Sequence, residues 1–105
     1  MYVSYEDISE DPSREVRRMA EFLGKKVSDE DVCKIVQFTA FGNMQMEKSL
    51  NYHYTGLDFK ISPYMRKGSV GDWKNHLTED QSRYIDEEYK KKCVPVGLKF
   101  LFELE

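Results

Sequence analysis

The sequence predicts an α/β fold, in the form of the tail of a domain whose other strands are missing from the chain. Three observations lead to this prediction: a short apolar run opens the chain, three stretches carry helix caps, and an alternating apolar stretch closes it. The predicted order is strand, helix, helix, loop, helix and arm, without internal repeats. At 105 residues the chain allows one small domain at most.

The first half of the chain is predicted to hold one strand end and two helices. The run MYVSYED suits the end of a buried strand. Asp11 is a helix cap with Pro12 in the first turn, and four apolar residues then recur at helical spacing before a glycine. Ser28 and Asp31 resemble a capping box, which predicts a second helix running toward QFTAFGNM.

The second half is predicted to be a loop, a helix and a terminal segment. Residues 48–63 show no sustained period and contain turn-forming residues, which indicates a loop. Thr78 and Gln81 form another capping-box pair, and the helix that they open is predicted to continue to about Lys92. Apolar residues then alternate over residues 98–104, as in a terminal strand or an extended arm.

Composition and charge exclude several classes of protein. With 40% hydrophobic and 33% charged residues the chain is globular in composition, and its net charge of -3 favours neither nucleic acid nor an anionic membrane as a partner. Cys33 and Cys93 lack the spacing of a zinc or redox site and the density of a disulfide scaffold, so we predict no metal. Without a signal peptide or a spanning apolar run, we expect a cytoplasmic protein.

The stretch MRKGSVGDWKN suits an anion. Arg66 offers a planar fork that matches two phosphate oxygens, Lys67 adds a point charge, and Gly68 lets the main chain come close. By composition alone, an ordinary solvated turn explains these residues better. Trp73 is interpreted as a packing anchor, and Asp72 as a helix cap or a partner for a nearby cation.

The wider string SPYMRKGSVGDWKN resembles the C-terminal signature of the cytosolic sulfotransferases, which move a sulfuryl group from 3′-phosphoadenosine 5′-phosphosulfate (PAPS) to hydroxyls or amines. The stretches YED, EFLGK, FTAF..M and NY precede it in the family's order, at close to its spacing. The resemblance implies that residues 1–105 are the C-terminal portion of a single sulfotransferase domain, mostly helices and loops. The family's α/β fold is related to that of the P-loop kinases.

The resemblance also implies which residues contact the cofactor, either as PAPS or as the product adenosine 3′,5′-bisphosphate (PAP). The residues that it assigns to the 3′-phosphate, to the nucleotide beside it and to the adenine are Arg66, Lys67, Gly68, Tyr64, Met65, Tyr5, Thr39, Phe41 and Met44. Taken singly, each of the adenine-side residues is also consistent with ordinary packing or with local backbone bonding. Ala40 stands where the family often has serine, and neither this change nor Tyr64 in place of phenylalanine removes the phosphate site.

The acceptor side and the catalytic groups are treated differently by the resemblance. It places Tyr52 and Phe59 beside the acceptor, where aromatic side chains suit a small planar molecule such as a phenol. An ordinary surface loop remains the alternative. The family's phosphosulfate-loop lysine and catalytic histidine lie upstream of this segment, and His53 and His76 do not match that histidine. We therefore predict no catalytic residue in this chain and no activity from it alone.

The family's short dimer motif, K-x-x-x-T-V-x-x-x-E, is altered here. Glu79 replaces its valine and Arg83 replaces its acid, so the usual dimer is not expected. Three interpretations of the chain then remain open. It is a C-terminal segment of a PAPS-dependent sulfotransferase, a non-catalytic phosphonucleotide-binding module, or a structural fragment whose loop binds nothing.

Overall fold

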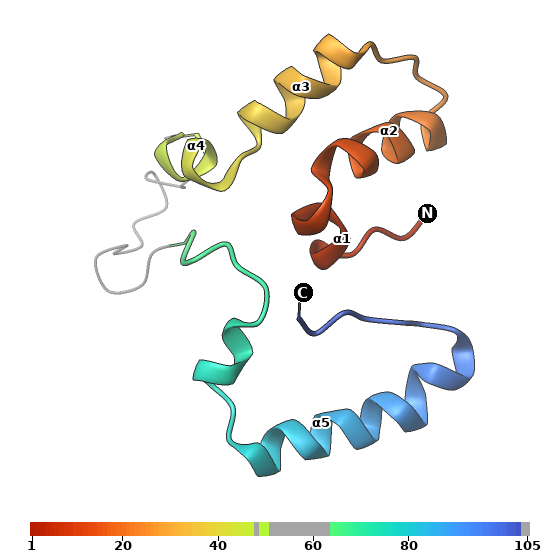
Figure 1. Ribbon diagram of the computed structural model, residues 1–105, viewed down its shortest axis with the longest axis vertical. Coiled ribbons are helices and arrows are strands. Elements are labelled where there is room, and N and C mark those ends of the chain that lie inside the picture. The colour runs from red at the N-terminus through yellow and green to blue at the C-terminus, as the bar shows by residue number, and fades with distance from the viewer. Residues whose placement is uncertain (48, 51–63, 104–105) are drawn as a thin grey trace.

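The computed structural model describes residues 1–47, 49–50 and 64–103, and these residues form helices joined by loops (Figure 1). No strand occurs within these ranges. In chain order the helices are α1 Tyr5–Glu10, α2 Pro12–Phe22, α3 Asp29–Phe38, α4 Phe41–Met46, the 3₁₀ helix η1 Asp72–Asn75, α5 Glu79–Lys92 and the 3₁₀ helix η2 Val94–Val96.

The predicted N-terminal strand is not formed: residues 1–4 have no regular structure, and a helix begins at Tyr5, where the strand was predicted to end. Ser4 is the N-cap of α1, and its hydroxyl accepts a hydrogen bond from the main-chain N–H of Asp7 at 3.0 Å. Glu6 and Asp7 place acidic groups in the first turn, where they favour the positive end of the helix dipole. A strand would in addition need a neighbour to pair with, and the described residues supply none.

The capped helices agree with the sequence. Asp11 accepts from the N–H of Arg14 at 2.9 Å, and α2 starts at Pro12 as predicted. The capping boxes of α3 and α5 are complete, with Ser28 and Thr78 as their N-caps. The helix that was predicted to run toward QFTAFGNM ends at Phe38, and a further helix that was not predicted, α4, begins at Phe41.

An ion cluster around the buried Glu15 fastens α1 to α2. Glu15 is fully buried, and its two oxygens accept from Arg14 Nε at 2.8 Å and from Arg18 at 2.6 Å. These hydrogen bonds, that of Arg14 first, hold the pKa of Glu15 below its ordinary value. Arg14 also contacts Glu10 at 3.1 Å and the carbonyl oxygen of Asp7 at 3.4 Å. The cluster thereby fixes the position of α1, which carries one edge of the candidate site.

Of the two forms predicted for the C-terminal segment, a strand or an extended arm, the structure shows the extended arm. The Tyr89 hydroxyl, on α5, accepts from the N–H of Phe100 at 3.3 Å. The ring of Tyr89 lies 5.7 Å from that of Phe100 and 5.3 Å from that of Phe102. Phe100 also meets the ring of Tyr2 at 6.2 Å, so the arm returns to the N-terminus, as Figure 1 shows.

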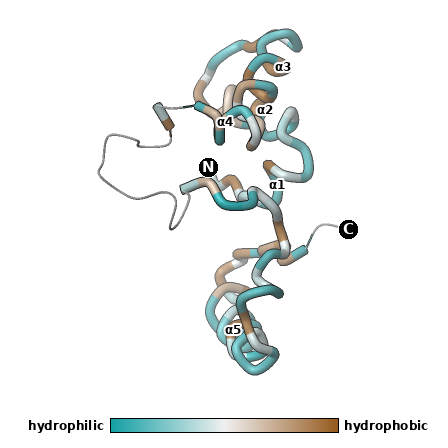
Figure 2. The backbone as a smooth tube through the Cα atoms, turned by 90° about the vertical axis from the view of Figure 1, so that its left-hand side faces the viewer, coloured by the Kyte–Doolittle hydropathy of each residue, from teal (hydrophilic) through white to brown (hydrophobic). Residues whose placement is uncertain are grey.

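The arrangement as a whole is open. Among the apolar side chains of the described residues only Ala20 and Val32 are buried, at the contact of α2 with α3. The accessible surface of 8724 Å² exceeds the roughly 6,100 Å² expected of a compact protein of 12.4 kDa. The radius of gyration, 17.1 Å, exceeds the roughly 13 Å expected at this length. Figure 2 shows α2 and α3 at one end and α5 at the other, with apolar residues distributed over both ends.

Candidate functional site

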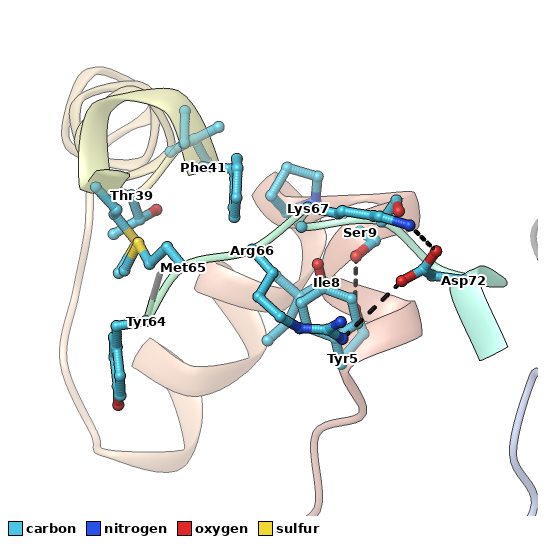
Figure 3. Close-up of a pocket in the computed structure, with 16 residues that line it drawn as sticks. Tyr5, Ile8, Ser9, Thr39, Phe41, Tyr64, Met65, Arg66, Lys67 and Asp72 are labelled. Carbon is cyan, nitrogen blue, oxygen red and sulfur yellow. Dashed lines mark hydrogen bonds and ion pairs between the residues drawn. The ribbon is translucent and has the colours of Figure 1, made fainter. Parts of the chain in front are cut away.

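One cavity of about 660 Å³ collects residues from three separate parts of the chain. Its walls are α1 and the start of α2, the junction of α3 with α4, and the loop that leads into η1 (Figure 3). The volume lies within the range of small-molecule sites. All nine residues that the resemblance assigned to the cofactor line it: Tyr5, Thr39, Phe41, Met44, Tyr64, Met65, Arg66, Lys67 and Gly68.

The α1 wall contributes more than the one residue predicted. Tyr5 is the first residue of the helix, and Ile8 and Ser9, which follow it by three and four positions, line the same cavity. The Ser9 hydroxyl donates to the carbonyl oxygen of Tyr5 at 2.9 Å, the bond drawn in Figure 3. Sequence reasoning missed Ile8 and Ser9 because it placed Tyr5 at a strand exit, where the helical spacing does not apply.

The α3–α4 wall is shaped by a break between two helices. The Thr39 hydroxyl donates to the carbonyl oxygen of Ile35 at 2.8 Å, one turn earlier, at the C-cap of α3. Ala40 then occupies the N-cap of α4 and supplies no side-chain hydrogen bond. Phe41 therefore starts the new helix with its ring at the cavity, and Met44 follows three residues later on the same wall.

The ring of Phe41 packs against Gly68, and both residues line the cavity. Gly68 has φ +63°, a left-handed conformation that glycine adopts without strain. A Cβ atom at this position would lie 2.1 Å from Cδ2 of Phe41, far inside van der Waals contact. The ring of Phe41 thus fills the space that any other side chain at residue 68 would need. A second link joins the two walls, because Gln45 on α4 donates to the carbonyl oxygen of Met65 at 3.4 Å.

The cations of the loop surround the carboxylate of Asp72. Lys67 Nζ donates to Asp72 Oδ1 at 2.5 Å, and the nearest nitrogen of Arg66 lies 3.9 Å from Oδ2. Asn75 donates to Oδ1 at 3.0 Å, and His76 Nε2 lies 3.0 Å from Oδ2. The pKa of Asp72 lies far below its ordinary value, chiefly because of the Lys67 hydrogen bond, followed by that of Asn75.

The other predicted roles near this loop divide as follows. Of the two roles suggested for Asp72, the partner of a cation is correct and the helix cap is wrong, because Gly71 is the N-cap of η1. Trp73 is a packing anchor as predicted, half-buried, with its indole N–H donating to the carbonyl oxygen of Phe102 at 2.9 Å. His76 is exposed as predicted, but it is bonded to Asp72.

The acceptor-side residues cannot be placed in this cavity. Tyr52, Phe59 and His53 lie outside the described residues, so their predicted positions stay predictions. The described site is therefore the part that the resemblance assigned to the nucleotide, with a cationic end at residues 66–68 and an apolar end at Phe41 and Met44.

Comparisons with known proteins agree with the resemblance carried by the motifs. The model of the sulfotransferase domain family matches residues 1–96. Cytosolic sulfotransferase 1 of Danio rerio is 47% identical over 105 residues, which is 99% of this chain and 35% of that protein. The chain thus spans about a third of the length of the curated relatives that it matches.

Two solved structures share the fold. Retinol dehydratase in a complex with retinol and PAP has a TM-score of 0.80 at 25% identity, over 92% of this chain and 29% of that one. A mouse sulfotransferase complexed with PAP has a TM-score of 0.69 at 29% identity, over 88% of this chain and 34% of that one. The helices and loops described above are accordingly a segment of the sulfotransferase fold. With most of its length matched by the family's model, the chain belongs to the sulfotransferase family.

Proposed function

We propose that this chain is the C-terminal portion of a sulfotransferase domain and that its cavity holds the 3′-phosphate and adenine end of PAPS or PAP. The observation that carries the proposal is the convergence of nine residues, assigned from three separate sequence motifs, on one cavity of about 660 Å³. Two relatives of known structure are complexes with PAP, which supports a nucleotide of this kind.

The charges of the described cavity suit a phosphate at one end. Arg66 and Lys67 bring two positive charges and Asp72 one negative charge, so the cationic end keeps a net positive charge. Both cations have about half of their side chains exposed, at 58% and 52%. The guanidinium of Arg66 presents a planar set of donors that matches two phosphate oxygens.

The other end suits a flat, apolar base. Phe41 and Met44 supply a ring and a thioether, and Tyr5 lines the same cavity from α1. Aromatic rings and sulfur atoms both pack well against the faces of planar rings. The distance along the wall from Phe41 to the cations is short, since the ring of Phe41 lies directly against Gly68. One bound nucleotide would therefore reach both ends.

Bound PAPS supplies the sulfuryl group that the enzyme transfers to a hydroxyl or amine. The residues of this chain bind and orient that cofactor, and we propose that the general base and the lysine beside the sulfonate belong to the remainder of the domain. Among the described residues His76 is the one histidine, and its Nε2 is engaged by Asp72. Because neither His53 nor His76 matches the family's catalytic histidine, we propose that the chain alone is inactive.

Partners and location follow from the same family assignment. We propose a small-molecule acceptor, with a phenol favoured by Tyr52 and Phe59, and no partner among nucleic acids or membranes. One of the relatives above was solved with retinol, a small molecule. Within the described residues no helix is both long and apolar enough to cross a bilayer. We further propose a cytoplasmic location, and assembly that does not use the family's usual dimer contact.

The test uses a completed domain, in which residues 1–105 replace the matching segment of the Danio rerio relative. Labelled PAPS is supplied with a phenol, an alcohol and an amine, and the unaltered relative serves as the positive control. We expect sulfuryl transfer to at least one acceptor, and a large loss of transfer in the Arg66→Met variant. A completed domain that is folded and monodisperse but binds no PAP would contradict the proposal. Binding without transfer would instead favour a non-catalytic phosphonucleotide-binding module.

A further inference from the structure

The two cations of the loop are not equivalent, because Asp72 engages them differently. Lys67 Nζ lies 2.5 Å from Asp72 Oδ1 and makes a charge-assisted hydrogen bond to it. The nearest guanidinium nitrogen of Arg66 lies 3.9 Å from Asp72 Oδ2, beyond hydrogen-bond distance. Asp72 therefore makes a direct hydrogen bond to the ammonium of Lys67, whereas it interacts with Arg66 only as a longer-range ion pair.

Asp72 is itself held in place. Its side chain is 13% exposed, and its oxygens also contact Asn75 and His76, the last residue of η1 and the residue after it. An ionised carboxylate has about four acceptor positions, so three partners use most of them. The lowered pKa of Asp72 agrees with this, since all three partners favour the ionised form. Through Asp72, Lys67 is fastened to the first turn of η1.

We propose that Asp72 is a positioning residue of the nucleotide site: it commits the Lys67 ammonium to an internal ion pair that fastens residues 66–68 to η1, and it leaves Arg66 as the side chain that binds the phosphate. The proposal rests on the proposed function in its second half only. The first half, the anchoring of the loop, concerns contacts within the chain. The two halves therefore need separate measurements.

The geometry gives each residue a different expected effect. Because the charge of Lys67 is largely balanced by Asp72, its removal releases the loop and disturbs any nucleotide, with or without a 3′-phosphate. Removal of Arg66 leaves the Lys67–Asp72 hydrogen bond intact and deletes the guanidinium that we assign to the phosphate, together with its ion pair to Asp72 at 3.9 Å. The selectivity for PAP over adenosine 5′-monophosphate, and not the affinity alone, therefore separates the two roles.

The first measurement is made without nucleotide, by hydrogen exchange over residues 66–71 of the completed domain. We expect Lys67→Met and Asp72→Asn each to speed exchange there, the double variant to be no faster than either, and Lys67→Arg to restore slow exchange. Arg66→Met should leave exchange unchanged, as should the matched control Lys74→Met, whose partner Glu103 lies 2.7 Å away and outside the cavity. Unchanged exchange in Lys67→Met, or additive effects in the double variant, would overturn the anchoring.

The second measurement is calorimetry with PAP and with adenosine 5′-monophosphate. We expect Arg66→Met to lower the preference for PAP about 30-fold or more, as for the loss of a charge-assisted pair, and Lys67→Met to change that preference by less than about threefold. Equal losses of preference in the two variants would overturn the division of roles. If the unaltered domain binds no PAP, the proposed function fails and the division of roles with it, while the exchange data alone decide the anchoring.

Discussion

Replacing Gly68 with alanine is expected to damage the proposed nucleotide site for two separable reasons. The residue has φ +63°, and a side chain in this conformation costs about 1–2 kcal/mol. In addition, the new Cβ would lie 2.1 Å from Cδ2 of Phe41, so the ring must withdraw by roughly 1.5 Å to restore ordinary contact. The first cost lowers stability, and the second moves the wall against which the adenine is proposed to pack.

Gly24 provides a matched control for the first cost. It has φ +65°, a Cβ atom added there would meet no other group within 4 Å, and it lies outside the cavity. In the completed domain, Gly68→Ala should therefore lose at least as much stability in urea as Gly24→Ala, and only Gly68→Ala should lose affinity for PAP, by about tenfold or more. Phe41→Ala should lower the affinity for PAP less in the Gly68→Ala variant than in the unaltered domain, because it also removes the clash between the two side chains. Unchanged PAP affinity in Gly68→Ala would refute this reasoning.

Three further outcomes are expected. The purified 105-residue chain should transfer no sulfuryl group from PAPS to phenols, steroids or amines, and turnover above background would show that it contains its own catalytic groups. The complete protein should sediment as a monomer or dimerise through another surface, because Arg83 is already paired with Asp80 of its own helix and two copies of Glu79 repel each other. The double change Glu79→Val with Arg83→Glu should strengthen association through this segment. A tight wild-type dimer that these changes weaken would contradict the prediction. In α3, the side-chain hydrogen bond and then the main-chain hydrogen bond from Ser28 lower the pKa of Asp31. The capping box therefore stabilises the helix above the unfolded-state pKa of Asp31, and this contribution is lost as the pH falls through the folded-state pKa. Asp31→Asn should remove that part of the acid dependence of helix content measured by circular dichroism, and an unchanged profile would argue against it.

The elements with local signals were predicted well from the sequence. Asp11, Ser28 and Thr78 each cap a helix at the predicted residue, because capping depends on side chains only three positions apart. The same local rule explains the error at the N-terminus, where Ser4 and Asp7 form a cap that the apolar run concealed. The apolar pattern of a strand end and that of a short helix are too similar over so few residues.

The candidate site was predicted only in part by physical reasoning. Composition favoured an ordinary turn for Arg66 to Gly68, and the family resemblance supplied the remaining residues from distant motifs. Neither indicated that Phe41 presses on Gly68 or that Asn75 and His76 share the carboxylate of Asp72. These contacts depend on a helix break at one point and a 3₁₀ turn at another, which the sequence pattern did not indicate.

The open packing of the chain could also not be predicted from the sequence pattern. Apolar side chains that belong to the predicted patterns, such as Leu23 before Gly24 and Leu98 in the alternating segment, are exposed at 67% and 40%. Periodicity predicts which face of a helix is apolar, but not what covers it. The family match, over about a third of the length of the relatives, is consistent with such faces meeting other parts of a sulfotransferase fold.

The most direct test of a 3′-phosphonucleotide site is a comparison of two ligands and two variants by calorimetry on the completed domain. We predict that the unaltered domain binds PAP more tightly than adenosine 5′-monophosphate. Arg66→Ala should lower the affinity for PAP by roughly 30- to 1,000-fold and lower the affinity for the monophosphate far less. Arg83→Ala removes an arginine outside the cavity and should change neither affinity. Equal affinity of the unaltered domain for the two nucleotides, or equal losses for both in Arg66→Ala, would contradict the assignment of the 3′-phosphate to this loop.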